Sequence, residues 1–463
     1  MVMIQGHQLM RIRKRKRKRP WRESEGFIVP FEDMGQHNPV RGKEPCFVRA
    51  TKEWRMTGIA MKLETPENIR TLQRKLYRKA KQEPGYRFYA LYDKVYRADI
   101  LEFAYDLVRA NKGSPGIDGQ SFEAIEAGEG VAAFLAKLEE ALRNKTYKPS
   151  PVKRVLIPKA DGGKRPLGIP TICDRVAQMA VKLVIEPIFE ADFCESSYGF
   201  RPKRSAHDAV DAVVAALQTG HTEVIDADIA KYFDTIPHAK LLATVAERIS
   251  DGEILHLIKL WLKAPVVEEG EDGKKRNVGG GKANRQGTPQ GGVISPLLAN
   301  LYLHLMDRIW KKYKLDIKLG ARMVRYADDF VVLCRKGTKR PMEVIQRILN
   351  RLGLSLSPTK TRELDSRKDS FRFLGFAIGM KKSTRTGKTY SHVEPSKKAL
   401  GAIRQKIAYL TRREMTCVPL DAMMEKVNQT LQGWVEYFHY RNCSRALGKL
   451  KWQIEERMRM QFA

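Results

Sequence analysis

The sequence predicts an α+β protein in which short antiparallel strands are followed by a helical C-terminal region. The stretch Met323–Arg335 reads MVRYADDFVVLCR, and its apolar, β-prone residues on both sides of a small acidic turn predict a hairpin. Glu223–His238 begins with apolar and acidic residues in alternation, which predicts a strand. Residues 381–463 carry three apolar stripes at helical spacing. At 463 residues, the chain is long enough for two to four domains.

The charge of the chain predicts a polyanionic partner. Lys and Arg number 85 against 53 acidic residues, which gives a formal net charge of +32. This excess is larger than solubility requires and creates an extended positive field, so nucleic acid is the first partner to expect. The alternative is a basic surface whose charges only contact solvent. Six cysteines without C-x-x-C spacing and the lack of a membrane-length apolar run predict a cytoplasmic protein without membrane association.

The N-terminal part is predicted to be a basic arm followed by helices. The run RIRKRKRKR at Arg11–Arg19 repels itself, which predicts an extended arm that binds RNA, serves as an address, or is only solvated. A helix is expected to begin with Thr65 as its cap and Pro66 at its first position. A second helix is expected over Asp99–Ala110, and the Gly-rich stretch KGSPGIDG that follows it is expected to form a loop.

A basic hairpin is predicted next. Val152–Thr171 reads as two strands joined by a turn at residues 160–163. Lys159 and Arg165 flank this turn on facing strands, where the ammonium and the guanidinium reach the same object. A triphosphate suits this pair because Arg binds phosphate bidentately and Lys acts as a point charge. The alternative is two basic residues on an exposed hairpin with no ligand.

The middle of the chain is predicted to be helical core with one Gly-rich turn. Helices are expected over Arg175–Phe189 and Leu241–Ala264, and the charged stretch Val267–Lys282 is expected to be an exposed loop. The following stretch, RQGTPQGGVISP, places Gln290 where it can contact a base or ribose edge. Its glycines, among them Gly291, allow the backbone to approach a ligand closely.

The acidic strands predict a metal site. Asp328 and Asp329 lie at the tip of the predicted hairpin, and Asp228 ends the earlier strand, with Asp226 on the same face. Adjacent carboxylates repel each other unless a cation lies between them, and Mg²⁺ prefers one or two carboxylates together with substrate phosphates. An acidic surface turn without any metal remains the alternative.

Beyond the hairpin, the sequence predicts a helix, a strand and a helical bundle. The helix is expected over Met342–Leu354, and the stretch after it brings Lys360 near the acids. The aromatic run Phe371–Phe376 is expected to be one short strand. The segment GWVEYFHYRN at Gly433–Asn442 belongs to the second of the three helical stripes.

Two motifs and their order resemble the catalytic palm of bacterial group II intron reverse transcriptases. They are the Asp-Ile-x-x-x-Phe-Asp segment at Asp228–Asp234 and the Tyr-Ala-Asp-Asp box at Tyr326–Asp329. The resemblance implies a right-hand polymerase with fingers, palm and an α-helical thumb. It divides the chain into a basic arm, an N-terminal extension with a template-lid loop, fingers with palm, and a thumb or maturase (X) domain, at 1–62, 63–125, 126–380 and 381–463. No His/Cys-bearing endonuclease segment follows the thumb, so target-strand nicking is not expected.

The resemblance also implies a reaction and a set of site residues. Asp228, Asp328 and Asp329 would be the catalytic acids and would hold two Mg²⁺ ions about 3.5–4 Å apart. Phe233 would be a steric gate against the ribose 2′-hydroxyl. The residues expected to contact the incoming nucleotide are Lys159, Arg165, Phe233, Gln290, Gly291 and Lys360.

The implied function is an RNA-directed DNA polymerase of a group II intron that also binds intron RNA and assists splicing and mobility. Its partners would be intron RNA, an RNA template, a DNA primer or target and dNTPs, and a homodimer is left open. Two other functions are also left open. One is an RNA-binding splicing cofactor whose polymerase site is dispensable, and the other is a host-adopted reverse transcriptase in repair or defence.

Overall fold

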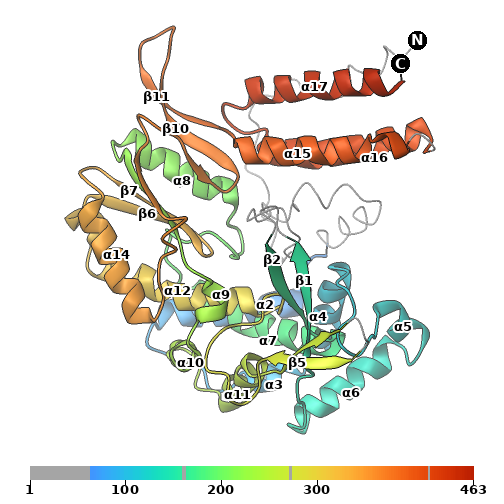
Figure 1. Ribbon diagram of the computed structural model, residues 1–463. Coiled ribbons are helices and arrows are strands. Elements are labelled where there is room, and N and C mark those ends of the chain that lie inside the picture. Colours follow the sequence, from blue (N-terminus) through green and yellow to red (C-terminus); the bar gives the residue numbers. More distant parts are fainter. Residues whose placement is uncertain (1–62, 159–162, 271–273, 416–417, 463) are drawn as a thin grey trace.

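The computed structural model describes residues 63–158, 163–270, 274–415 and 418–462 (Figure 1). The predictions for the basic arm, for Lys159 and for residues 160–162 of the turn after it therefore lie outside the described residues. Figure 1 shows helices α2 to α7 at the lower end of the view and α15, α16 and α17 at the upper end. No helix in the described ranges combines the length and the hydrophobicity needed to cross a bilayer.

The N-terminal helices pack around one buried helix, α7. Their bounds are α2 Glu67–Gln82, α3 Tyr92–Val95, α4 Ala98–Ala110, α5 Phe122–Ala127, α6 Val131–Arg143 and α7 Ile172–Glu190. Helix α7 is apolar along most of its length and contacts α2, α3 and α4. The Thr171 hydroxyl caps it by accepting a hydrogen bond from Asp174 N. The predicted core helix is therefore confirmed, with a start three residues earlier.

The predicted cap of the first helix is wrong by one residue. Pro66 is the N-cap of α2, with φ −52° and ψ 144°, and no side chain caps this helix. The extended backbone at Pro66 places the first helical residue at Glu67 rather than at the proline, so Thr65 lies outside the capping position.

The first sheet, which we call the basic sheet, has the strand order β2-β1-β4-β5. Its strands are β1 Val152–Pro158, β2 Lys164–Ile169, β4 Val266–Glu269 and β5 Lys275–Gly279. The antiparallel β1–β2 hairpin confirms the prediction. The expected loop at Val267–Lys282 is wrong, because β4 pairs in parallel with β1 and antiparallel with β5. Every residue of β5 is exposed, so no apolar alternation marked it as a strand.

The second sheet, the acidic sheet, has the order β6-β7-β3-β8 and is antiparallel throughout. Its strands are β3 Glu223–Asp228, β6 Ala321–Tyr326, β7 Asp329–Cys334 and β8 Arg362–Asp365. It lies between two hydrophobic cores, because Ile225 and Ala227 pack on one side and Val224 on the other. This alternation confirms both the predicted strand and the predicted hairpin.

Helix α8 packs against β6 and β7 of the acidic sheet, and α13 contacts β6. The helices between α7 and the third sheet are α8 Ala206–Gln218, α9 Tyr232–Thr235, α10 His238–Ala246, α11 Gly252–Leu262, α12 Ser295–Lys312, α13 Leu315–Lys318 and α14 Lys339–Leu352. The expected single helix Leu241–Ala264 is wrong, because it is two helices, α10 and α11. The carboxylate of Asp251 accepts hydrogen bonds from Glu253 N and Ile254 N, which starts α11 anew.

The third sheet joins the acidic sheet to the helical bundle. Its strands are β9 Phe371–Phe373, β10 Phe376–Lys382 and β11 Thr389–Pro395, in the order β11-β10-β9. The expected single strand Phe371–Phe376 is wrong because Leu374 and Gly375 form a tight turn, with φ 50° and 82°. Because Leu374 is apolar, the sequence pattern does not distinguish this turn from the apolar strands on either side.

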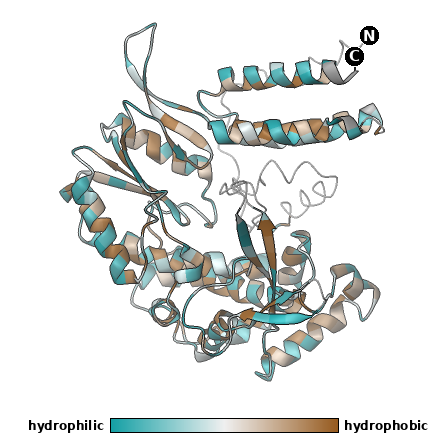
Figure 2. Cartoon of the chain, viewed as in Figure 1, coloured by the Kyte–Doolittle hydropathy of each residue, from teal (hydrophilic) through white to brown (hydrophobic). Residues whose placement is uncertain are grey.

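The C-terminal bundle consists of the three helices that the apolar stripes predict. They are α15 Lys397–Leu410, α16 Leu420–Phe438 and α17 Ser444–Phe462, with a 3-10 turn, Arg413–Met415, after α15. Figure 2 shows hydrophobic and hydrophilic residues alternating along all three. Trp434 of α16 is fully buried and packs against Phe438, with ring centroids 4.5 Å apart.

Candidate active site

The predicted acids meet at one end of the acidic sheet. Strand β3 ends at Asp228 and β7 begins at Asp329, and the antiparallel register sets these two residues opposite each other. Asp328 lies beside them in the two-residue turn between β6 and β7. Asp226 lies two residues earlier on β3, which places it on the same face of the strand. Four carboxylates thus gather within a few residues of one hairpin tip.

The electrostatics of this cluster favour a cation. Burial raises the pKa of Asp328, and the charge of Asp228 raises it further. Burial also raises the pKa of Asp329 well above its usual value, and the neighbouring acids, with Asp226 the strongest, add to this rise. Burial raises the pKa of Asp226 to about 6. Since each acid makes its neighbours harder to ionise, an added positive charge would stabilise the cluster.

Lys360 supplies part of that positive charge. Its Nζ lies 3.3 Å from Asp228 Oδ2, so the structure brings Lys360 to the acids as the sequence predicts. Arg165 and Lys360 both lower the pKa of Asp328, which places both cations near the hairpin tip. The cationic side chains therefore approach the acids from two different parts of the chain, β2 and the segment before β8.

The carboxylates of the site suit a hard divalent ion whose remaining ligands come from water and substrate phosphates. Within the described ranges, no three His, Cys, Asp or Glu side chains are arranged to enclose a metal ion. The register pair Asp228 and Asp329, with Asp328 adjacent, offers only carboxylate oxygens. Mg²⁺ retains several waters and binds through one or two carboxylates plus phosphates, so an incomplete protein cage at a carboxylate pair suits it.

Arg165 and Gln290 are in direct contact beside the β1–β2 hairpin. Arg165 Nε donates to Gln290 Oε1 at 3.1 Å, and Gly168 N donates to Gln290 O at 2.6 Å. Two of the predicted nucleotide-binding side chains, which are 125 residues apart in sequence, are therefore in direct contact. The Gln290 amide is already oriented by Arg165.

The glycines of this turn are required by contacts within the protein. Gly291 has φ +110°, and a Cβ on it would lie 2.3 Å from Gly168 O. A Cβ on Gly292 would lie 2.7 Å from Ser295 Oγ. Close packing against β2 and α12 thus accounts for both glycines, and the approach of a ligand to Gly291 stays a prediction.

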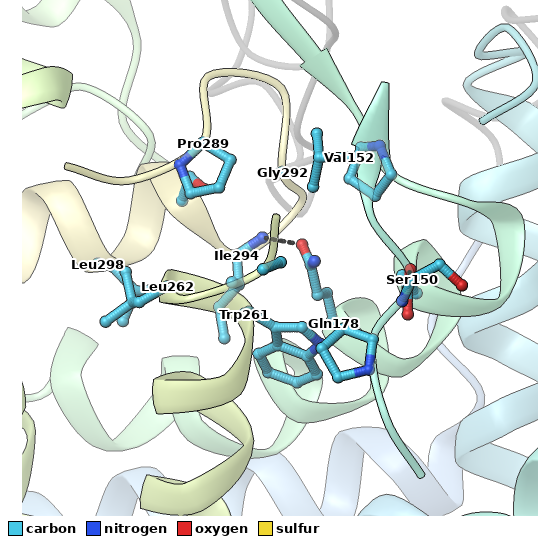
Figure 3. A pocket seen from close by; sticks show the side chains of 14 residues that line it. Ser150, Val152, Gln178, Trp261, Leu262, Pro289, Gly292, Ile294 and Leu298 are labelled. Carbon is cyan, nitrogen blue, oxygen red and sulfur yellow. Dashed lines mark hydrogen bonds between the residues drawn. The ribbon is translucent and has the colours of Figure 1, made fainter. Parts of the chain in front are cut away.

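A small cavity lies behind the same turn (Figure 3). Gln178, Trp261, Pro289 and Ile294 are among its lining residues, and Gln178 Oε1 accepts a hydrogen bond from Ile294 N at 3.4 Å. Its volume of about 10 Å³ is roughly that of one water molecule. It is a packing space under the turn and is far too small for a nucleotide.

Phe233 is the more exposed ring of the aromatic pair that follows Asp228. Tyr232, the preceding residue, is buried, and its hydroxyl donates to Ala299 O. Phe233 is only partly buried on α9, with its ring centroid 5.6 Å from that of Tyr232. Tyr232 is therefore the core aromatic of the pair, and Phe233 is the ring left accessible after Asp228.

Two residues of the site were missed by sequence reasoning. The sequence predicts Asp226 only as a member of the acidic face, and the alternation that predicts β3 is the signal that could have placed it in the site. Arg325 is completely buried under the hairpin tip and donates to Ala327 O. An Arg inside an apolar strand was a signal that could have drawn attention to it, because a buried charge requires a partner.

Two family profiles match this chain. The family profile described as reverse transcriptase (RNA-dependent DNA polymerase) matches residues 157–378. The profile of the group II intron, maturase-specific domain matches residues 400–462. The chain belongs to the reverse transcriptases, RNA-directed DNA polymerases, of the group II intron type, as its resemblance implied.

The relatives differ in how much of their length the chain spans. Protein YkfC of Escherichia coli is 35% identical over 68% of this chain and 89% of its own length. Group II intron-encoded protein LtrA of Lactococcus lactis is 32% identical over 64% of this chain and 57% of its own. An uncharacterized 91 kDa protein in the cob intron of Schizosaccharomyces pombe is 27% identical over 73% of this chain and 45% of its own.

Among solved structures, apo telomerase from Candida tropicalis has a TM-score of 0.41 at 15% identity, over 62% of this chain and 58% of that chain.

Proposed function

We propose that this chain transfers nucleotidyl groups from dNTPs to the 3′-hydroxyl of a DNA primer on an RNA template. The observation that carries the proposal is the pairing of Asp228 with Asp329 across β3 and β7, beside the turn that holds Asp328. These three carboxylates are proposed to hold two Mg²⁺ ions. When bound, the ions lower the pKa of the primer hydroxyl and stabilise the charge of the leaving pyrophosphate.

The remaining predicted residues are assigned to the nucleotide. The primer oxygen bonds to the α-phosphorus while the bond to the pyrophosphate oxygen breaks. Lys159 and Arg165 would bind the triphosphate, and Gln290, oriented by Arg165, would contact the base or ribose edge with Gly291. Phe233 would exclude the 2′-hydroxyl. Lys360, whose Nζ lies 3.3 Å from Asp228 Oδ2, would contact the incoming nucleotide beside the acids.

The second part of the proposal is assistance to a group II intron. The match of residues 400–462 to the maturase-specific domain supports intron RNA binding and splicing. The net charge of +32 suits an RNA partner, because each phosphate contact releases counterions. Mobility of the intron would combine this binding with the polymerase site and a DNA target.

Primer extension on an RNA template tests the polymerase site. Asp328→Ala should lower cDNA synthesis by more than about 100-fold, since loss of a mere outer partner of a metal ligand already costs 10- to 100-fold. Asp365→Ala is the control, because Asp365 lies on β8 of the same sheet but is paired with Arg367 at 2.9 Å. Normal synthesis by folded Asp328→Ala protein would refute the assignment of the site.

Splicing of an intron RNA at low Mg²⁺ tests the maturase part separately. If the chain acts as a splicing cofactor with a dispensable polymerase site, Asp328→Ala protein should splice as well as the wild type. Loss of splicing in a folded Asp328 variant that still binds the RNA would contradict independent roles.

A further inference from the structure

The turn that carries Asp328 has an unfavourable backbone conformation. Ala327 and Asp328 are the two residues between β6 and β7, and Ala327 has φ +58°. Primed hairpin turns require a positive φ at this position, and glycine, asparagine or aspartate usually supplies it. A residue with a Cβ persists in such a conformation only when its surroundings hold it there. The position of Asp328 therefore depends on what holds Ala327.

The Arg325 side chain holds the turn from inside the protein. It is fully buried, and its Nη1 donates to Ala327 O at 2.8 Å. The other edge of the guanidinium binds Asp307 of α12, with Nε 3.0 Å from Oδ1 and Nη2 bonded to Oδ2. Asp307 is also buried, so the ion pair anchors the turn to the helix under the sheet.

A second path of contacts reaches the same turn through Asn300. Arg325 Nη1 also donates to Asn300 Oδ1 at 2.9 Å, and Asn300 Nδ2 donates to Gly199 O. Gly199 lies directly against the turn, since a Cβ there would be 2.4 Å from Ala327 N. Arg325, Asn300, Gly199 and Ala327 thus form a closed ring of contacts around the turn.

Only arginine can make this set of bonds. Its planar fork directs two N–H groups to one carboxylate and a third nitrogen to other acceptors, whereas lysine donates from a single atom. Stability alone does not account for the arrangement, because the ion pair with Asp307 would be complete without the bond to Ala327 O. That additional bond is made to the peptide group immediately before Asp328.

We infer that Arg325 is a positioning residue for the metal-binding carboxylate: through Ala327 O it fixes the turn in which Asp328 meets Asp228 and Asp329. The inference rests on the proposed polymerase function. Arg325 acts through the turn and has no contact with substrate in this role. Loss of the Arg325 side chain should leave nucleic-acid binding intact and should raise the Mg²⁺ concentration that polymerisation requires.

The test is the double variant Arg325→Met with Asp307→Leu. Removing both charges together avoids an unpaired buried carboxylate, which a single Arg325→Met would leave. The folded double variant should bind primer–template as the wild type does. Its polymerisation rate at low Mg²⁺ should fall by about 10- to 100-fold, as for a lost partner of a metal ligand. The Mg²⁺ concentration that gives half the maximal rate should rise, and high Mg²⁺ should restore part of the activity.

Arg325→Lys is the second variant, and it tests the same inference if the double variant does not fold. Lysine keeps a charge opposite Asp307 but cannot keep all of the bonds, so its Mg²⁺ requirement should rise as well. Arg248→Met is the matched control. Arg248 is also buried and donates to the carbonyls of Ala80 and Tyr86, at the N-terminal helices. It should lower thermal stability without changing the Mg²⁺ requirement.

The outcomes separate the inference from the proposed function. A wild-type protein without polymerase activity would defeat the proposed function itself. A wild-type polymerase whose folded Arg325 variants keep its rate and its Mg²⁺ requirement would overturn the inference alone. A rise in the Mg²⁺ requirement of the Arg248 control equal to that of the Arg325 variants would also overturn it, because the effect would then follow from lost stability.

Discussion

The acidic sheet and the basic sheet contribute opposite kinds of structure to one site. In the acidic sheet, β7 is buried from Phe330 to Cys334, and its carboxylates lie at the end of an apolar strand. In the basic sheet, β5 is exposed along its whole length and no residue of β2 is fully buried. The acids proposed to be catalytic are thus held by a packed core, whereas Arg165, which is proposed to bind the triphosphate, extends from a surface hairpin.

This difference explains which strands could be predicted. Strands β3, β6 and β7 consist of alternating or continuous apolar residues because hydrophobic cores lie on both sides of them. That pattern is visible in the sequence. Strands β4 and β5 pair through backbone groups that any side chain allows, and the exposed residues Lys275 to Gly279 carry no such pattern. The boundary between α10 and α11 was not predicted for another reason. Both helices are apolar, and the five residues between them, which end in the Asp251 cap, contain no Gly or Pro.

The same reasoning applies to the site. The acids were predicted because they lie at the ends of strands that the sequence pattern and a family motif both mark, and the stretch before β8 predicts Lys360 near them. The fold brings these residues together. Arg325 was missed because its partner, Asp307, lies 18 residues away on a helix that reads as an apolar core element. Sequence shows a charge inside a strand but does not show where its counter-charge lies. Asp226 was missed because alternation gives a face and not a distance.

The largest expected effect is a pH-dependent loss of stability in the acidic sheet. The pKa of Asp226 is about 6 in the folded protein, mainly through burial, and lower in the unfolded chain. The folded state therefore binds more protons between the two values, so the metal-free protein should lose stability as pH rises from about 4 to 6. The loss should be roughly 2–3 kcal/mol for this group.

Urea unfolding of the metal-free protein at a series of pH values measures this effect. Asp226→Asn should flatten the pH dependence by the stated amount, and Mg²⁺ should stabilise the wild type more at pH 8 than at pH 5. Val278→Thr, on the exposed strand β5 of the basic sheet, changes no charge and should leave the slope unchanged. Identical pH profiles for wild type and Asp226→Asn would show that the buried acid does not control the stability of the sheet.

The second prediction concerns Phe233, which follows Asp228 by five residues and is only partly buried. Replacing Phe233 with Val should open space against the sugar and raise ribonucleotide use relative to deoxyribonucleotide use. Forcing extra volume into a filled site costs about 1–3 kcal/mol, so discrimination should fall by roughly one to two powers of ten. Single-nucleotide incorporation with dNTP and rNTP gives the ratio directly.

Tyr232→Phe is the control for the aromatic pair. It removes only the hydroxyl that donates to Ala299 O, so stability should fall by about 1 kcal/mol while sugar preference stays the same. If the Phe233 variant polymerises with unchanged preference, the gate is not at this ring. If Tyr232→Phe changes the preference instead, the assignment within the pair is reversed.

The smallest expected effect belongs to the basic sheet, at Arg165. Arg165→Ala should raise the KM for dNTP by about tenfold, since a hydrogen bond to a charged group contributes about 1.5 kcal/mol or more. Because β2 is not part of a buried core, the free energy of unfolding should change little. Lys153→Ala is the control on the neighbouring strand, where Lys153 pairs with Glu269 at 3.0 Å. A large loss of stability in Arg165→Ala with an unchanged KM would mean that the hydrogen bond between Arg165 and Gln290 stabilises the fold and does not bind the nucleotide. The roles of the two sheets would then differ less than their burial indicates.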